Sequence, residues 1–373
     1  MRGKLIFVLL FLTVFLSLSA FAQLQCGDCD GNHFVNILDA HAAAKYGVGT
    51  YLLPEPQFSA CNVAGTPGNH YYPEASVGSS DSLFISQYVV GRRSKLDCIL
   101  DDPYVFTSGR YSFFRIFLMD QDGSNQREVR FNGSNTTHSN NPAMSPDGKW
   151  IVFEKIVGPI IQIFRVPITV QPSDNPEQLT FNTSGHNTDP VWSPDGKKIA
   201  FTSGRTSPFN YNLYVLDLST RQEQMLVSGS SFGSNYYVLN PEWSHDGSEI
   251  VFAAGGPGGS SGTYYIYKVS SSGGSVQQLT TTPTLRELGW GLDGRIAFMR
   301  NTTFPASVFT MNSNGSNETL LTIFPDLGSS VSWHRDGGSL LFTSGSQIYN
   351  MAAFSGAPIN QLTTLGGNWD ARH

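Results

Sequence analysis

The chain has 373 residues, 14% of them charged, and a formal net charge of −6 at pH 7. Its basic residues are dispersed, which excludes the clustered positive surface that binds nucleic acid. No stretch after residue 22 is apolar for long enough to cross a membrane. The 38 glycines, 20 prolines and 25 phenylalanines favour β-structure joined by turns.

The N-terminal segment, residues 1–22, is predicted to be a signal peptide. Arg2 and Lys4 precede an apolar run from Leu5 to Leu18, and Ala20-Phe21-Ala22 offers a small-x-small cleavage site. An uncleaved membrane anchor is the alternative, but the apolar run is shorter than the roughly 20 residues that a spanning helix needs. We therefore expect a secreted, extracellular or periplasmic protein with no membrane span after cleavage.

All four cysteines fall close together, at Cys26, Cys29, Cys61 and Cys98. An even number of clustered cysteines in an exported chain predicts disulfides that close a small module. Three pairings remain open, and a zinc site is the competing interpretation, although no second Cys pair of matching spacing is present. The cluster divides the chain into a module at residues 23–100 and a large domain at residues 101–373.

The small module contains a candidate calcium loop that begins at Asp28. Oxygen-bearing side chains occupy positions 1, 3, 5, 9 and 12, and Phe34 would supply a backbone carbonyl; the predicted ligands are Asp28, Asp30, Asn32, Phe34, Asn36 and Asp39. Ca²⁺ prefers oxygen ligands at this spacing. A possible second loop runs from Asn62 to Asp81. The alternative is a surface turn, rich in Asp and Asn, that disulfides hold in place.

The loop and the segment after it resemble a dockerin module, which carries two such EF-hand-type halves. Asp81–Gly91 aligns with Asp39–Gly49 and places Tyr88 on Tyr46, as a duplicated helix would. The resemblance implies a small α-helical module that binds Ca²⁺ and docks to a cohesin-like or other extracellular protein.

Five copies of one motif follow in the large domain. Their Asp-Gly pairs begin 48, 51, 47 and 43 residues apart, at Asp147, Asp195, Asp246, Asp293 and Asp336. Asp-Gly is a hairpin-turn signal, because glycine adopts a positive φ readily. Each pair precedes a β-branched or aromatic run that is typical of a strand. The period is that of a four-stranded propeller blade, with the aspartates capping turns.

The two ends of the domain predict how the ring of blades closes. Tyr104–Arg110 matches Ile199–Arg205, a second strand with its following loop, so the first blade begins without a first strand. Asn368-Trp369 matches the start of the repeat. Pairing this C-terminal segment with residues 104–131 completes six blades and removes the open sheet edges that invite aggregation.

The repeat resembles that of TolB-like propellers, and Asn187-Thr-Asp-Pro-Val-Trp-Ser-Pro-Asp-Gly196 carries the likeness with little deviation. The resemblance covers about residues 102–373. It implies an all-β six-bladed β-propeller, here with C-terminal strand closure, after the α-helical calcium-loop module. Members are mostly binding scaffolds, and some related propellers accompany peptidases or act as lyases, so the fold alone does not assign chemistry.

Polar residues are expected to gather at one mouth of the central channel. They come from the loops that enter first strands, from the loops after second strands and from the inner strands: His138, His186, Asp189, Arg110, Arg205, Glu242 and Glu287. Such a rim suits a peptide, a glycan or a metal, and a solvated rim of ordinary loop residues is the alternative.

The sequence has no nucleophile elbow and no His-Glu-x-x-His motif, so we predict no catalytic residues. The favoured function is a secreted, non-catalytic binding or scaffold propeller that the dockerin-like module tethers to a partner or surface assembly. The alternative is a secreted polysaccharide hydrolase or lyase that uses His138 and His186 with a divalent metal.

Overall fold

A computed structural model describes residues 103–372 except for 208–209, 234–235, 257–263, 301–305, 325–327, 335–336 and 365–366. The chain divides into two units between residues 98 and 99, and the described residues belong to the second. The predicted signal peptide and the four cysteines lie outside the described residues. So do the predicted calcium ligands, which are Asp28, Asp30, Asn32, Phe34, Asn36, Asp39, Asn62 and Asp81. The α-helical module therefore stays a prediction. No helix among the described residues is long and apolar enough to span a membrane.

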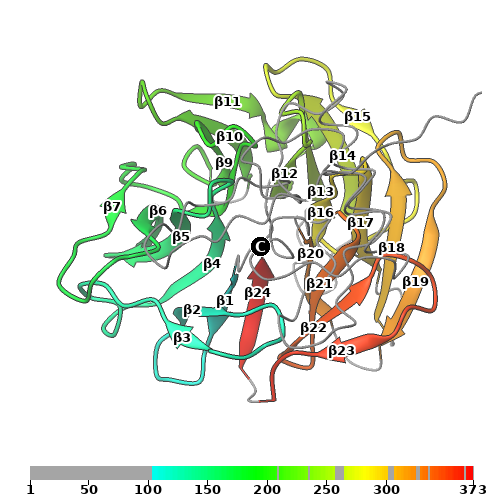
Figure 1. Ribbon diagram of the computed structural model, residues 1–373. Helices are drawn as coiled ribbons and strands as arrows, with labels where there is room; N and C mark the ends of the chain where they lie inside the picture. Colours follow the sequence, from blue (N-terminus) through cyan, green and yellow to red (C-terminus); the bar gives the residue numbers. More distant parts are fainter. Residues whose placement is uncertain are drawn as a thin grey trace, which may run out of the picture. The chain divides into compact units, whose positions relative to one another are not determined.

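The second unit is a ring of six four-stranded antiparallel sheets (Figure 1). Blade 1 contains β24 (Asn368–Arg372), β1 (Tyr104–Ser108), β2 (Arg115–Met119) and β3 (Arg127–Glu128). Blade 2 contains β4 (Ser139–Met144), β5 (Trp150–Val157), β6 (Ile160–Pro167) and β7 (Glu177–Gln178). Blade 3 contains β8 (Asn187–Trp192), β9 (Lys198–Ser203), β10 (Asn212–Asp217) and β11 (Glu223–Val227).

The second half of the ring repeats this order from the inner strand outward. A short 3₁₀ helix, η1 (Gly229–Phe232), lies between the last strand of blade 3 and the first strand of blade 4. Blade 4 contains β12 (Tyr237–Trp243), β13 (Glu249–Gly255), β14 (Tyr264–Ser270) and β15 (Gln277–Gln278). Blade 5 contains β16 (Leu288–Trp290), β17 (Arg295–Arg300), β18 (Ala306–Asn312) and β19 (Thr319–Phe324). Blade 6 contains β20 (Gly328–Trp333), β21 (Ser339–Ser344), β22 (Gln347–Ala352) and β23 (Ile359–Gln361).

The C-terminal strand closes the ring, as the sequence predicts. β24 pairs antiparallel with β1, with Thr107 opposite Trp369 and Ser108 opposite Asn368. Figure 1 shows β24 beside β1, although the two strands come from opposite ends of the propeller sequence. The pairing covers the inner edge of β1, which would otherwise present unpaired backbone groups.

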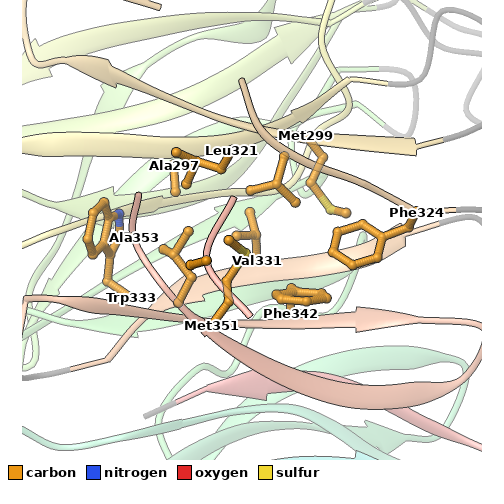
Figure 2. Packing of buried hydrophobic residues seen from close by; sticks show 12 residues of the cluster. Ala297, Met299, Leu321, Phe324, Val331, Trp333, Phe342, Met351 and Ala353 are labelled. Carbon is orange, nitrogen blue, oxygen red and sulfur yellow. The ribbon is translucent and has the colours of Figure 1, made fainter. Parts of the chain in front are cut away.

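The core of the propeller lies between neighbouring blades. Each second strand contributes one phenylalanine with no exposed surface: Phe106, Phe153, Phe201, Phe252, Phe298 and Phe342. Figure 2 shows the cluster between blades 5 and 6, where Phe342 lies among Val331, Met351 and Phe324. Burying a side chain of this size contributes roughly 1.5–3 kcal/mol. The hydrophobic runs after each Asp-Gly pair are therefore what binds one blade to the next.

The repeated motif has a structural role that blade 3 shows clearly, at the end of its inner strand. The carboxylate of Asp195 accepts hydrogen bonds from the Ser193 hydroxyl (2.6 Å) and the Lys197 backbone N–H (3.1 Å). The indole N–H of Trp192 donates to the carbonyl of Ala143 in the preceding blade (3.2 Å). The aspartate thus caps the β8–β9 turn, and the tryptophan joins two blades.

Candidate functional site in the propeller channel

Four of the six inner strands carry a β-bulge at which an Asn or Asp adopts a positive φ. The residues and angles are Asn141 (52°), Asp189 (55°), Asn240 (48°) and Asp370 (48°). Asn and Asp tolerate this conformation better than other L-residues do. The pairing register shifts at the same place in β4, β8, β12 and β24. The bulges therefore place short polar side chains at equivalent points around the channel.

A buried carboxylate network joins blades 2 and 3 at this level. The Asn141 side-chain amide donates to Glu154 Oε1 and to Asp189 Oδ1, each at 2.8 Å. Glu154 also accepts from the backbone N–H of Asp189 (2.8 Å), and Asp189 accepts from the Thr202 hydroxyl (3.1 Å). Glu154 is 3% exposed. Burial, together with the nearby charge of Asp189, raises the pKa of Glu154 well above its ordinary value.

An ion pair crosses the channel. Arg372 lies on β24 of blade 1 and Glu242 on β12 of blade 4, the opposite blade of the six, and Arg372 Nη1 is 2.8 Å from Glu242 Oε1. Burial raises the pKa of Glu242 to about 7, although the guanidinium of Arg372 acts against the shift. The pair occupies the axis of the channel and connects the C-terminal strand to the far side of the ring.

Blade 5 contributes a further acidic group, Glu287, with its own cation, Arg286. Arg286 Nε donates to Glu287 Oε1 at 3.0 Å. Burial raises the pKa of Glu287 to about 7, and it raises the pKa of Asp370 from its ordinary value as well. Asp189, Asp370 and Arg372 each influence Glu287, although they lie on other blades. Among the described residues, the channel therefore contains five carboxylates and two guanidiniums. The carboxylates come from Glu154, Asp189, Glu242, Glu287 and Asp370, and the guanidiniums from Arg286 and Arg372.

The two predicted histidines occupy equivalent places and make equivalent contacts. The backbone N–H of Phe114 donates to Nδ1 of His138 (3.1 Å), and that of Ile161 donates to Nδ1 of His186 (3.0 Å). Each ring thus joins the loop before an inner strand to the hairpin of the preceding blade. Because Nδ1 already accepts a hydrogen bond, Nε2 is the nitrogen that remains for a ligand.

The predicted arginines are held against their own blades and do not reach the channel groups. Arg110 donates to Gln126 (2.9 Å) and Asn368 (3.1 Å), and its Cζ lies 4.7 Å from the centre of the Phe117 ring. Arg205 pairs with Glu223, donates to Asn187 (2.9 Å) and covers Tyr214. These contacts are stabilising cation–π and ion-pair contacts within a blade.

Of the seven predicted residues, Asp189, Glu242 and Glu287 are brought together in the channel. Sequence reasoning missed Glu154, Asp370, Arg372 and Arg286. The repeat contained a signal for two of them. Glu154 follows the core phenylalanine of its blade, at a position where blades 1 and 3 have Thr107 and Thr202, so a charged residue there departs from the pattern. Asp370 occupies the position that Asp189 has in the repeat. Among the described residues, no group of three or more His, Cys, Asp or Glu side chains is arranged to hold a metal ion.

Comparisons with known proteins agree on the propeller. The family model described as "TolB beta propeller domain" matches residues 103–322. The structure of TolB from Acinetobacter baumannii is similar, with a TM-score of 0.60, 21% identity, and coverage of 79% of this chain and 70% of that one. A chain of a Nidogen/Laminin complex gives a TM-score of 0.53 at 10% identity and covers 72% of this chain and 97% of its own. At these identities the likeness establishes the fold alone. No curated protein matches the chain.

Proposed function

Because this chain belongs to the TolB β-propeller family, we propose that it is an exported, non-catalytic binding propeller with its ligand site at the mouth of the channel. The observation that carries the proposal is the Arg372–Glu242 ion pair, which joins inner strands of opposite blades across the channel. A ligand that enters from the mouth would meet charged groups held in place by hydrogen bonds. Such preorganised groups favour binding, because little side-chain entropy is lost when the ligand arrives.

The ligand class in this proposal is a peptide or a glycan with hydrogen-bond donors. The channel supplies more carboxylates than guanidiniums, so donor groups complement it. The Nε2 atoms of His138 and His186 add two further polar positions at the rim.

The dockerin-like module is proposed to tether the propeller to a cohesin-like or other extracellular partner, with Ca²⁺ as its ligand. The support is the spacing of the oxygen-bearing residues after Asp28. A pull-down of the secreted full chain, with Ca²⁺ and with a chelator, tests the tether. We expect a partner that is retained only with Ca²⁺ and is lost in Asp28→Ala; retention in that variant would contradict the calcium loop.

The channel proposal has a separate test. A peptide or glycan that the wild-type chain still retains with the chelator, and therefore without the calcium loop, should bind Glu287→Gln at least about tenfold more weakly, a loss of roughly 1.4 kcal/mol. Glu318→Gln, on the outer part of blade 5, is the control and should bind as the wild type does. Equal binding by all three proteins would place the ligand outside the channel.

A second candidate function is a secreted polysaccharide hydrolase or lyase. The observation that favours it is the Glu154–Asp189 pair, since two neighbouring carboxylates in different environments are typical of acid–base sites. Metal analysis and turnover on a panel of polysaccharides test it. Activity that is lost in Glu154→Gln would support an enzyme, and no turnover with any substrate would support the binding propeller.

A further inference from the structure

Blade 5 has an outer strand unlike those of most other blades. The outer strands β3, β7 and β15 have two residues each and β23 has three, whereas β19 has six. Among the described strands β19 pairs with β18 alone, so one of its edges has no partner strand. Proteins keep outer strands short or charged, because a free edge is a template for another strand. β19 is long, and Thr319–Phe324 contains no charged residue.

The apolar surface continues from β19 onto blade 6. The backbone N–H of Gly356, in the β22–β23 turn, donates to the carbonyl of Leu321 at 3.4 Å, so this turn lies against β19. Figure 1 shows β19 and β23 at the periphery of the ring, in neighbouring blades. Four large apolar side chains are exposed on these segments and define the blade 5–6 rim: Leu320 (39%), Ile323 (53%), Phe354 (59%) and Ile359 (39%).

The blade 5–6 rim carries no net charge. No residue in 337–369 is charged. The charged side chains that adjoin the rim are paired within blade 5: Glu318 binds Arg300 at 2.8 and 2.9 Å. Arg295, which also contacts the β22–β23 turn, lies 2.6 Å from Asp293. Two copies of a chain with a net charge of −6 repel each other, and the repulsion is weakest where neither copy presents a charge.

We propose that two copies of this chain form a dimer through the blade 5–6 rim, with β19 of one copy pairing antiparallel to β19 of the other across a two-fold axis. β19 is extended, uncharged and equal in length to the free edge that it would cover. The two-fold axis brings the Leu320 end of one strand beside the Ile323 end of the other, so apolar side chains meet apolar side chains. Such a contact is the same on both copies and closes at two.

A second strand suits this surface better than a lipid bilayer does. A bilayer would accept the four apolar side chains, but it would leave the backbone groups at the free edge of β19 without hydrogen-bond partners. A strand satisfies both. The contact is limited to a strand about 20 Å long and one turn, whereas permanent dimers bury about 2,000 Å² or more. We therefore expect a reversible dimer with a micromolar Kd and a monomer that is folded by itself.

The inference does not rest on the channel proposal. Sedimentation velocity of the full chain, from about 1 to 100 μM, tests it. The sedimentation coefficient should rise with concentration, and more so at high salt, because salt screens the repulsion between the copies. Hydrogen exchange of the Thr319–Phe324 amides should be slower at the high concentration, since pairing protects them. A chain that stays monomeric throughout, or amides that exchange equally fast in the dimer, would overturn the proposal.

Variants then locate the contact. Ile323→Lys and Leu320→Lys each place like charges at the two-fold contact and should raise the dimer Kd at least about tenfold. The control is Met225→Lys, which removes another exposed side chain (48%) from an outer strand, the five-residue β11 of blade 3, and should dimerise as the wild type does. Melting curves establish that each variant is folded. Unchanged dimerisation by both rim variants, or an equal loss in Met225→Lys, would overturn the proposal.

Flotation with vesicles of phosphatidylcholine and phosphatidylglycerol tests the other occupant of the same surface. We expect the wild-type chain to stay with the unbound protein, as Ile323→Lys does. Flotation of the wild type that Ile323→Lys abolishes would assign the blade 5–6 rim to a lipid surface and overturn the dimer.

Discussion

Arg372 on the last strand and Glu242 on the opposite blade form an ion pair of 2.8 Å across the channel, with side chains only 11% and 17% exposed. Buried ion pairs contribute little to stability as a pair, but removing one partner leaves an unpaired charge in a medium that solvates it poorly. The contact therefore couples the stability of blade 1 to that of blade 4.

Arg372→Met should destabilise the protein by about 3–5 kcal/mol at pH 8, because it leaves the Glu242 carboxylate buried and charged without a cation beside it. The loss should be smaller at pH 5, where Glu242, with a pKa of about 7, carries a proton. The double variant Arg372→Met/Glu242→Gln should recover most of the loss. Urea denaturation measures all three proteins, and a double variant as unstable as the sum of the single changes would contradict the coupling.

Deleting residues 366–373 should lower the melting temperature far more than an ordinary terminal truncation does. The deletion removes β24, leaves the inner edge of β1 unpaired and exposes part of the core around Phe106. Deleting His373 alone is the matched control and should leave the melting temperature close to that of the wild type. A normal melting temperature for the longer deletion would refute closure of the ring by β24.

Stability should fall as the pH rises from about 5 to 8. Glu242 and Glu287 have folded-state pKa values of about 7, above the value of 4.5 expected when unfolded. Between these values the folded protein binds more protons than the unfolded chain, so raising the pH removes stability, roughly 1.4 kcal/mol per pKa unit and group.

Glu287→Gln should flatten this dependence, since the amide does not titrate. Asp217→Asn is the control: the pKa of Asp217 is about 2, because the Ser219 hydroxyl hydrogen-bonds its carboxylate, so it stays ionised throughout the range. Denaturation midpoints at four pH values provide the measurement. A wild-type slope of the opposite sign would show that the channel carboxylates are ionised when folded.

The junction of blades 1 and 2 can be rebuilt to resemble that of blades 2 and 3. Ser139 stands where Asn187 stands, and Arg115 where Gln162 stands. Asn187 donates to Gln162 at 2.7 Å. Arg115→Gln alone loses the contact of Arg115 with Glu128, at 3.1 Å, and should be destabilised. The double variant Ser139→Asn/Arg115→Gln should be more stable than Arg115→Gln by about 1 kcal/mol, the net value of a typical hydrogen bond. Ser139→Asn alone lacks the acceptor and should gain no such hydrogen bond. Thermal denaturation compares them, and a double variant no more stable than Arg115→Gln would show that the amide pair does not form.

Much of the fold was predictable from the sequence, because blade formation depends on neighbouring residues. Asp-Gly pairs at 43–51 residue intervals mark the turns, and the phenylalanines after them mark the core. The matched segments at Tyr104 and Asn368 predicted the closing strand, and the pairing of β1 with β24 confirms it. The calcium loop, the disulfides and export remain predictions.

The sequence by itself determined six blades, their strand order and the closing strand, since a repeat specifies the same hairpins and buried positions wherever it occurs. Only the tertiary structure decided which polar groups meet. Glu242 and Arg372 lie 130 residues apart, and they pair because opposite inner strands face the same axis. His138 and His186, which the sequence placed in the predicted rim, each accept at Nδ1 a hydrogen bond from a backbone N–H group of the preceding blade. Such contacts depend on side-chain directions at the bulges and loops, which no local pattern specifies.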